Sequence, residues 1–160
     1  MKTNKLTLCA VLASVAIILG YVESLLPVPI AIPGIKWGLG NIVILTALYL
    51  LDIKYAFFIM LVKVIASTLL FMSPSAFLYS LSGGVLSILV MVILKKLNLH
   101  IINVSIGGGI FHNIGQLFMA SFVMRTFSVF YYLPVLIISG AVSAVVNALL
   151  SEIVLKRIKR

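Results

Sequence analysis

The sequence predicts an all-α integral membrane protein, in which six transmembrane helices form one bundle and both chain ends lie in the cytoplasm. The first observation behind this prediction is composition: 63% of the 160 residues are apolar, only 9% are charged, and the mean hydropathy is +1.30. A water-soluble domain of this size could not bury so much apolar surface in one core. The other two observations are a series of apolar segments and a one-sided distribution of lysine and arginine. We therefore expect a single transmembrane domain over 1–160.

The expected helices follow from cutting the apolar segments at charges, prolines and glycines. They cover about 6–26, 38–51, 55–72, 76–94, 104–124 and 133–155. A helix needs roughly 20 residues to cross a bilayer, with a range of about 17–25. Five segments fit this range, and 38–51 is shorter. The first segment resembles a signal peptide, but its length and the spans that follow it favour a retained helix.

The stretch 27–37 comes before the short segment and contains Pro27, Pro29 and Pro33. Prolines at this density do not fit inside a regular helix. We predict a structured loop that dips toward the membrane, where such a backbone needs protein or water around it. This loop either belongs to a binding site or only connects two helices.

The orientation follows from the excess of lysine and arginine in cytoplasmic loops. With the N-terminus inside, nine cations face the cytoplasm, Lys36 and Arg125 face outside, and Lys63 lies within a helix. The nine are Lys2, Lys5, Lys54, Lys95, Lys96, Lys156, Arg157, Lys159 and Arg160. Most of the net charge of +9 thus comes from cations that set the orientation of the protein and attract anionic lipid;. Nucleic-acid binding is not expected, because these residues lie in short loops with no soluble domain to present them.

A stripe of small residues runs along the first expected helix at helical spacing: Cys9, Ala13, Ala16 and Gly20. Small residues let helices approach closely in lipid. The stripe predicts either packing within this subunit or docking onto another membrane protein. Because Cys9 is the single cysteine and no Cys/His cluster occurs, we expect no internal disulfide, metal or cofactor.

Polar residues within the apolar segments carry the functional signal, because burying them in a membrane is costly. Lys63 lies near the middle of its helix, whereas the predicted topology places Glu23, Asp52 and Glu152 at other depths. Three interpretations stay open: Lys63 is neutral through desolvation, it bonds the carbonyls of a helix end, or it faces a cavity that admits an anionic ligand.

A second polar group occurs in the segment 104–124, where His112 and Gln116 share one helix face and Asn113 is turned away from them;. These residues either form hydrogen bonds between helices or contact a ligand. Asn147, at a comparable depth, and polar residues nearer the outer face complete the outline of an outward-facing pocket. They are Glu23, Lys36, Asn41, Tyr79, Ser80, Ser82 and Asn147.

Three further stretches are informative together: Pro33–Asn41, Leu78–Gly84 and His112–Gln116. In this order they resemble the Gx transporter family, also called heptaprenyl diphosphate synthase component I. This chain has Gly40 where that group often has alanine. The group in turn resembles the substrate-binding S components of energy-coupling factor (ECF) transporters. That resemblance implies six helices, a ligand pocket near the outer face, and docking through small residues of the first helix onto a membrane coupling subunit driven by two ATPases. The stripe from Cys9 to Gly20 matches this docking surface loosely, since the Ala-x-x-x-Ala signature is absent.

The two names of the group imply different functions. A trans-prenyltransferase holds magnesium through clustered aspartates, and this chain has no two acids within four residues of each other;. It also lacks a nucleotide-binding loop, so we expect a non-catalytic protein. The first hypothesis is a substrate-binding subunit in the bacterial cytoplasmic membrane for uptake of a small anionic or quinone-precursor-like molecule. The second is a membrane accessory component of a heptaprenyl diphosphate synthase in the menaquinone pathway, bound to a soluble synthase. The third is a structural or assembly protein.

Overall fold

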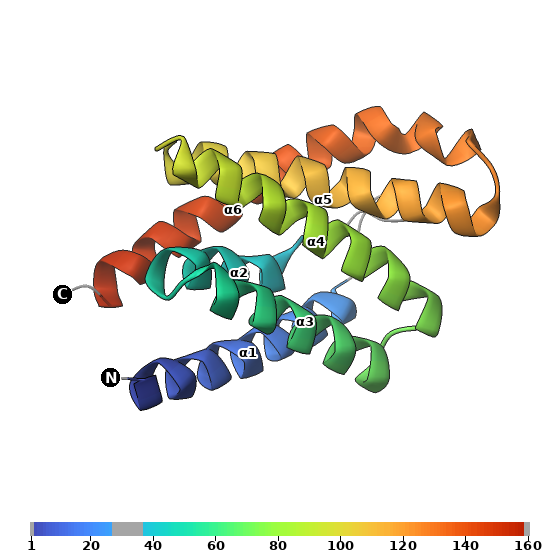
Figure 1. The fold of residues 1–160 in the computed structure, drawn as a ribbon. Coiled ribbons are helices and arrows are strands. Elements are labelled where there is room, and N and C mark those ends of the chain that lie inside the picture. The colour runs from blue at the N-terminus through green and yellow to red at the C-terminus, as the bar shows by residue number, and fades with distance from the viewer. Residues whose placement is uncertain (1, 27–36, 159–160) are drawn as a thin grey trace.

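The computed structural model describes residues 2–26 and 37–158, and within them the predicted all-α class with six α-helices is confirmed (Figure 1). The helices are α1 (Lys2–Leu25), α2 (Leu39–Leu50), α3 (Ile53–Leu70), α4 (Pro74–Lys96), α5 (Ile101–Met124) and α6 (Leu133–Ile158). A short 3-10 helix, η1 (Ser128–Tyr132), precedes α6 and was not predicted. The predicted loop 27–37, including Lys36, lies outside the described residues except for Trp37.

Compared with the predicted bounds, α3 and α4 begin two residues earlier and α5 begins three residues earlier. Three other helix ends run further into charged sequence than predicted, to Lys2, Lys96 and Ile158. The prediction ended them near lysines and arginines, because charge marks the edge of the apolar layer. Lysine and arginine are nevertheless good helix formers, so the backbone continues through them into the polar layer.

Successive helices run in opposite directions, so that the start of α1 and the end of α6 lie at the same end of the molecule (Figure 1). We call this the termini end, and the opposite end, where α1, α3 and α5 finish, the far end. That both chain ends lie on one side of a membrane, and that this side is the cytoplasm, stay predictions.

Four of the helices are long and apolar enough to cross a membrane: α1, α3, α4 and α6, the last together with η1. Their outer faces carry large apolar side chains, such as Leu69, which is 80% exposed, and Ile138, which is 66% exposed. Apolar patches of this extent are solvated by lipid, which makes this a multi-pass membrane protein. The fifth long helix, α5, is not in this group, since glycines and the polar residues around His112 interrupt its apolar sequence.

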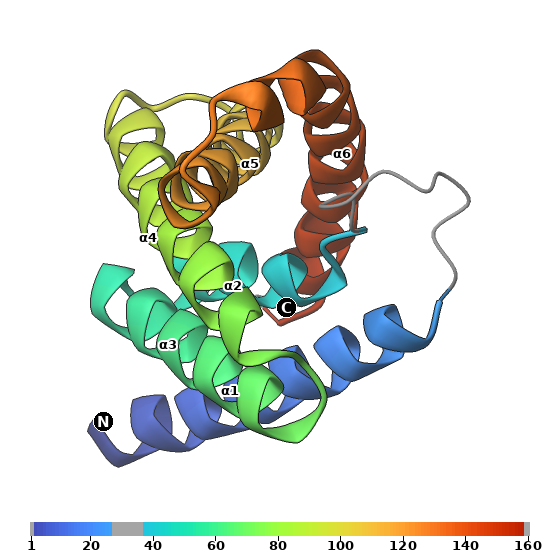
Figure 2. The ribbon, with the colours of Figure 1, turned by 90° about the vertical axis from the view of Figure 1, so that its right-hand side faces the viewer.

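The short helix α2 lies in the middle of the bundle, as the view from the far end shows (Figure 2). It packs against α1, α3 and α6, and its residues 42–48 are all buried. Twelve residues rise only about 18 Å, which is less than the roughly 30 Å of a bilayer core;. Its C-terminal end is held by Lys95, whose Nζ donates to the carbonyl oxygen of Leu48 at 2.6 Å. Because α2 does not extend to the far end, the bundle has room for a pocket above its first turn.

The small-residue stripe of α1 faces the inside of the molecule. Cys9, Ala13 and Ala16 are buried in the core, and Gly20 lines the pocket described below. The structure thus shows packing within the subunit, which was one of the two alternatives. In this conformation the three buried side chains are not exposed to a docking partner.

Candidate functional site

A pocket of about 450 Å³ is lined by residues from all six helices. It extends from the far end, at Ser24 and Ser73, past the middle of the bundle to Met91 and Ser105, in the halves of α4 and α5 nearer the termini end. The predicted topology places the far end outside the cell.

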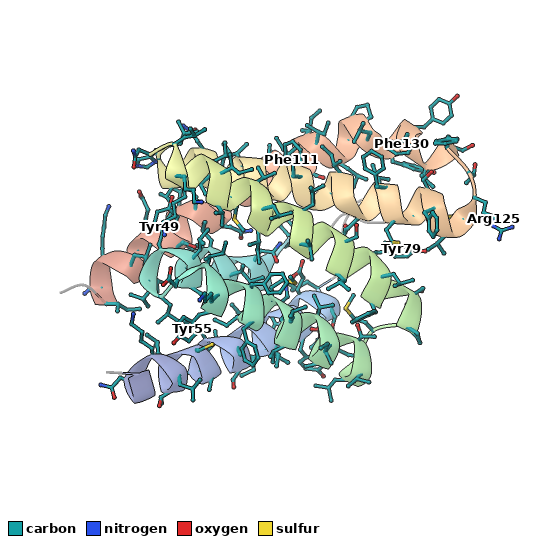
Figure 3. The ribbon with its side chains drawn as sticks, in the orientation of Figure 1. Tyr49, Tyr55, Tyr79, Phe111, Arg125 and Phe130 are labelled. Atoms are coloured by element: carbon teal, nitrogen blue, oxygen red, sulfur yellow. The ribbon has the colours of Figure 1, made fainter. Side chains whose placement is uncertain are left out.

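Most of the predicted site residues line this pocket. Those that do are Glu23, Asn41, Lys63, Ser80, His112, Asn113, Gln116 and Asn147. Tyr79 lies on α4 toward the far end (Figure 3), and neither it nor Ser82 belongs to the lining. Arg125, one of the two cations predicted outside, lies at the far-end tip of α5 and is exposed (Figure 3).

The side chain of Lys63 lies across the first turn of α2. Its Nζ donates to Oδ1 of Asn41 at 3.0 Å. A Cβ atom at Gly40 would lie only 2.6 Å from Cε and 2.7 Å from Nζ of Lys63. The glycine at position 40 therefore allows Lys63 to take this position, which an alanine would obstruct.

Gly38 joins three elements at the start of α2. Its amide donates to Oε1 of Glu23 on α1 at 2.6 Å, and its carbonyl oxygen accepts from Nδ2 of Asn147 on α6 at 3.2 Å. Its φ of 70° lies in the left-handed region, where glycine carries no steric penalty;. Glu23 and Asn147 are thereby fixed on two sides of the same residue, next to the turn that holds Lys63.

Two oxygen atoms, each buried within a residue of the lining, have no hydrogen-bond partner among the described residues. They are Oγ of Ser67, whose residue is 4% exposed, and Oδ1 of Asn147, whose residue is 5% exposed. Buried polar atoms are nearly always paired in folded proteins, and leaving one unpaired costs about 1–3 kcal/mol. Such atoms in the wall of a pocket are typical of a site that a ligand completes. The sequence analysis did not single out Ser67, although it lies one helical turn from Lys63 on the same face.

The polar residues of α5 divide into two groups. Nδ2 of Asn113 donates to the carbonyl oxygen of Leu136 on α6 at 2.7 Å, so this amide bonds two helices, which was one of its two predicted roles. His112 and Gln116 face the pocket beside Gly83 of α4, where an added Cβ would lie 3.1 Å from Cε1 of His112 and 2.9 Å from Cγ of Gln116. They are therefore placed to contact a ligand that reaches the middle of the bundle.

The chemistry of the pocket is mixed. One carboxylate, Glu23, and one cation, Lys63, lie toward the far end, while Leu45, Met60 and Ile88 give the deeper walls an apolar surface. Such a site suits a small molecule with both polar and apolar parts. Within residues 2–26 and 37–158, no group of three or more His, Cys, Asp or Glu side chains is arranged to hold a metal ion.

Comparison with known proteins identifies a family. No curated protein and no solved structure matches the chain. The sequence model of the family described as heptaprenyl diphosphate synthase component I matches residues 12–154, which extend from α1 to α6. Because this match covers most of the chain and confirms the resemblance carried by the three sequence motifs, the chain belongs to the heptaprenyl diphosphate synthase component I family.

Proposed function

We propose that this chain is a non-catalytic membrane component that binds a small molecule in the pocket above α2. The observation that carries the proposal is the pair of unpartnered buried oxygens, on Ser67 and Asn147, in the same pocket as Lys63. Unpartnered polar atoms buried inside a membrane protein are costly, and a bound ligand would offset that cost. In this proposal Lys63 binds an anionic or hydrogen-bond-accepting group, and His112 and Gln116 bind the deeper part of the ligand.

Family membership supports a role in polyprenyl diphosphate synthesis, as an accessory component that holds a soluble synthase at the membrane. The termini end would be the contact surface, because exposed cations such as Lys96, Lys156 and Arg157 gather there. The chain itself would leave catalysis to its partner, since it has only three acidic residues, at 23, 52 and 152, and these are too far apart in sequence to form an Asp-rich motif;.

Uptake of a small molecule is the second candidate function, and the position of the pocket favours it. The pocket reaches the far end, which is the outer side in the predicted topology of a bacterial cytoplasmic membrane protein. ATP-driven uptake would require a membrane coupling subunit and ATPases, because this sequence has no nucleotide-binding loop;.

Both functions share the proposal that a small molecule binds in the pocket, and native mass spectrometry of the protein purified in mild detergent tests this binding. We expect a co-purifying small molecule with the wild type and at least a tenfold lower occupancy with Lys63→Met, which keeps the length of the side chain and removes its charge. Lys54→Met is the matched control, since Lys54 is exposed at the start of α3 and lies outside the pocket. Equal occupancy in wild type and Lys63→Met would exclude Lys63 as a ligand contact.

The accessory function and uptake can be distinguished by different measurements, because each involves a different partner. A prenyl diphosphate synthase that co-purifies in detergent and is lost when Lys156 and Arg157 are replaced by glutamine would support the accessory function. Uptake of the co-purified molecule into cells, lost with Lys63→Met, would support transport.

A further inference from the structure

The pocket holds side chains of opposite charge on either side of one helix turn. Glu23 of α1 accepts from the amide of Gly38, just before α2, and Lys63 of α3 donates to Asn41 in the first turn of α2. Both charged residues line the pocket. A ligand in this space therefore meets a positive and a negative group within the reach of one small molecule.

The region around Gly38 presents hydrogen-bond acceptors to a ligand. Because Nδ2 of Asn147 is held by the carbonyl of Gly38, its Oδ1 is the atom left to accept, and it has no partner in the described part of the chain. The carboxylate of Glu23 is also only an acceptor, and its two oxygens can take more bonds than the one from Gly38;. A carboxylate and a buried amide oxygen around one residue select for N–H donors, and a cationic donor fits best beside Glu23.

The region around Lys63 has the opposite preference. Its ammonium group is a donor only, and the unpartnered hydroxyl of Ser67 lies one helical turn along α3;. Beyond these polar groups, Met60, Ile88 and Met91 form apolar walls toward the middle of the bundle. The volume of about 450 Å³ is within the range of pockets for small molecules, roughly 300–1,000 Å³;.

We propose that the ligand is dipolar: a cationic N–H donor group binds between Glu23 and Asn147, an anionic group binds Lys63, and an apolar body packs against Met60 and Met91. This inference rests on the proposed function and narrows its ligand to zwitterions such as amino acids and their derivatives. A ligand that carries only negative charge would bring that charge near Glu23 and leave Oδ1 of Asn147 unpaired, and both effects weaken binding.

Three probes with one aromatic body and different charges test the inference: L-tryptophan, indole-3-propionate and tryptamine. Their affinities for the full chain in detergent are measured by isothermal titration calorimetry. We expect L-tryptophan to bind at least tenfold more tightly than either probe with a single charge. Glu23→Gln, which can still accept from the amide of Gly38, should reduce the advantage of L-tryptophan over indole-3-propionate to less than threefold. Lys63→Met should reduce the advantage of L-tryptophan over tryptamine to less than threefold. The control Lys54→Met should change neither affinity ratio.

The inference is overturned if indole-3-propionate binds the wild type as tightly as L-tryptophan, or if Glu23→Gln leaves their ratio unchanged. It is also overturned if the molecule that co-purifies with the protein carries charge of one sign only; the proposed function then stands. If nothing co-purifies and none of the three probes binds, the inference and the proposed function both fail.

Discussion

At the scale of single residues, the buried serines of this protein differ in one respect that matters for stability. Oγ of Ser151 donates to the carbonyl oxygen of Ile42 at 3.1 Å, and Oγ of Ser105 donates to that of Ala144 at 2.7 Å. Oγ of Ser67, equally buried, has no partner among the described residues. A hydrogen-bonded hydroxyl contributes to folding, whereas an unpaired one opposes it. Ser67 is thus a candidate for a residue kept for binding at some cost in stability.

Ser67→Ala is expected to leave the melting temperature of the purified protein unchanged or slightly higher, because it removes an unpaired polar atom without opening a large cavity. The same substitution should lower the retention of the co-purifying ligand. Ser151→Ala is the matched control: it breaks a buried hydrogen bond of about 0.6 kcal/mol, a typical value in membranes, and should lower the melting temperature while ligand retention is preserved. Thermal denaturation of the three proteins, each followed by native mass spectrometry, makes the comparison. A clear fall in stability with Ser67→Ala would mean that its hydroxyl is paired in the folded protein.

The polar residues of the pocket could be found from the sequence to a limited extent. Lys63, His112 and Asn147 stand out because charged and amide side chains are rare in apolar helices, and the structure brings all three to one pocket. Ser67 could not be found, since serine is common in membrane helices and only its neighbours decide whether its hydroxyl is paired. The sequence also could not show which polar residue of α5 bonds another helix and which ones face the pocket. Only the packing of α6 shows that Asn113 donates to the carbonyl oxygen of Leu136.

At the scale of elements, the contact between α4 and α5 depends on glycines that let two backbones touch. A Cβ atom at Gly115 would lie 2.9 Å from the carbonyl oxygen of Ser82, and one at Gly83 would lie 2.7 Å from that of His112. Oγ of Ser82 also donates to the carbonyl oxygen of Gly115 at 2.9 Å. Since the opposing atoms belong to backbone, an added methyl group can be accommodated only by moving one helix.

Gly115→Ala is therefore expected to destabilise the protein by about 1–3 kcal/mol, the usual cost of overpacking. The measurement is the melting temperature in detergent, which should fall by several degrees. Gly20→Ala provides the control, because a Cβ there would meet its nearest atoms at 3.6 Å or more, which is ordinary contact. If both variants melt at the same temperature, the close approach of α4 and α5 is not a determinant of stability.

The helices themselves were predictable, but the role of α2 was not. Hydropathy and helix breakers gave a short segment at 38–51, and the structure has α2 at Leu39–Leu50. Its central position depends on contacts with α1, α3 and α6, which no local pattern encodes. Periodicity could not indicate it either, because a helix that is apolar all round has no preferred face.

At the scale of the whole molecule, the distribution of charge matches the shape of the bundle. The described cations outside the pocket are divided between its two ends. Those near the helix ends at the termini end are Lys5, Lys54, Lys95, Lys96, Lys156 and Arg157. Arg125 lies at the far end (Figure 3). Exposed aromatic side chains are most exposed at the far end, with Phe127 at 84% and Tyr131 at 86%, compared with 56% for Phe58 near the start of α3. Aromatic residues of this kind are typical of the boundary between lipid and water. The fold thus has two chemically distinct ends, as a protein that crosses a membrane in one orientation requires.

The positive-inside rule assigns the termini end to the cytoplasm, and a reporter at each end tests the assignment. Alkaline phosphatase is active only outside the cytoplasm and green fluorescent protein fluoresces only inside it, so fusions after Arg160 should give fluorescence and no phosphatase activity. The same reporters inserted after Thr126, in the connection between α5 and η1, should give the opposite result, which serves as the internal control.

Replacing Lys95 and Lys96 with glutamine should leave the orientation unchanged, since most of the cationic residues at that end persist. Phosphatase activity from the Arg160 fusion would reverse the orientation, place the mouth of the pocket in the cytoplasm, and thereby favour the accessory function over uptake from outside.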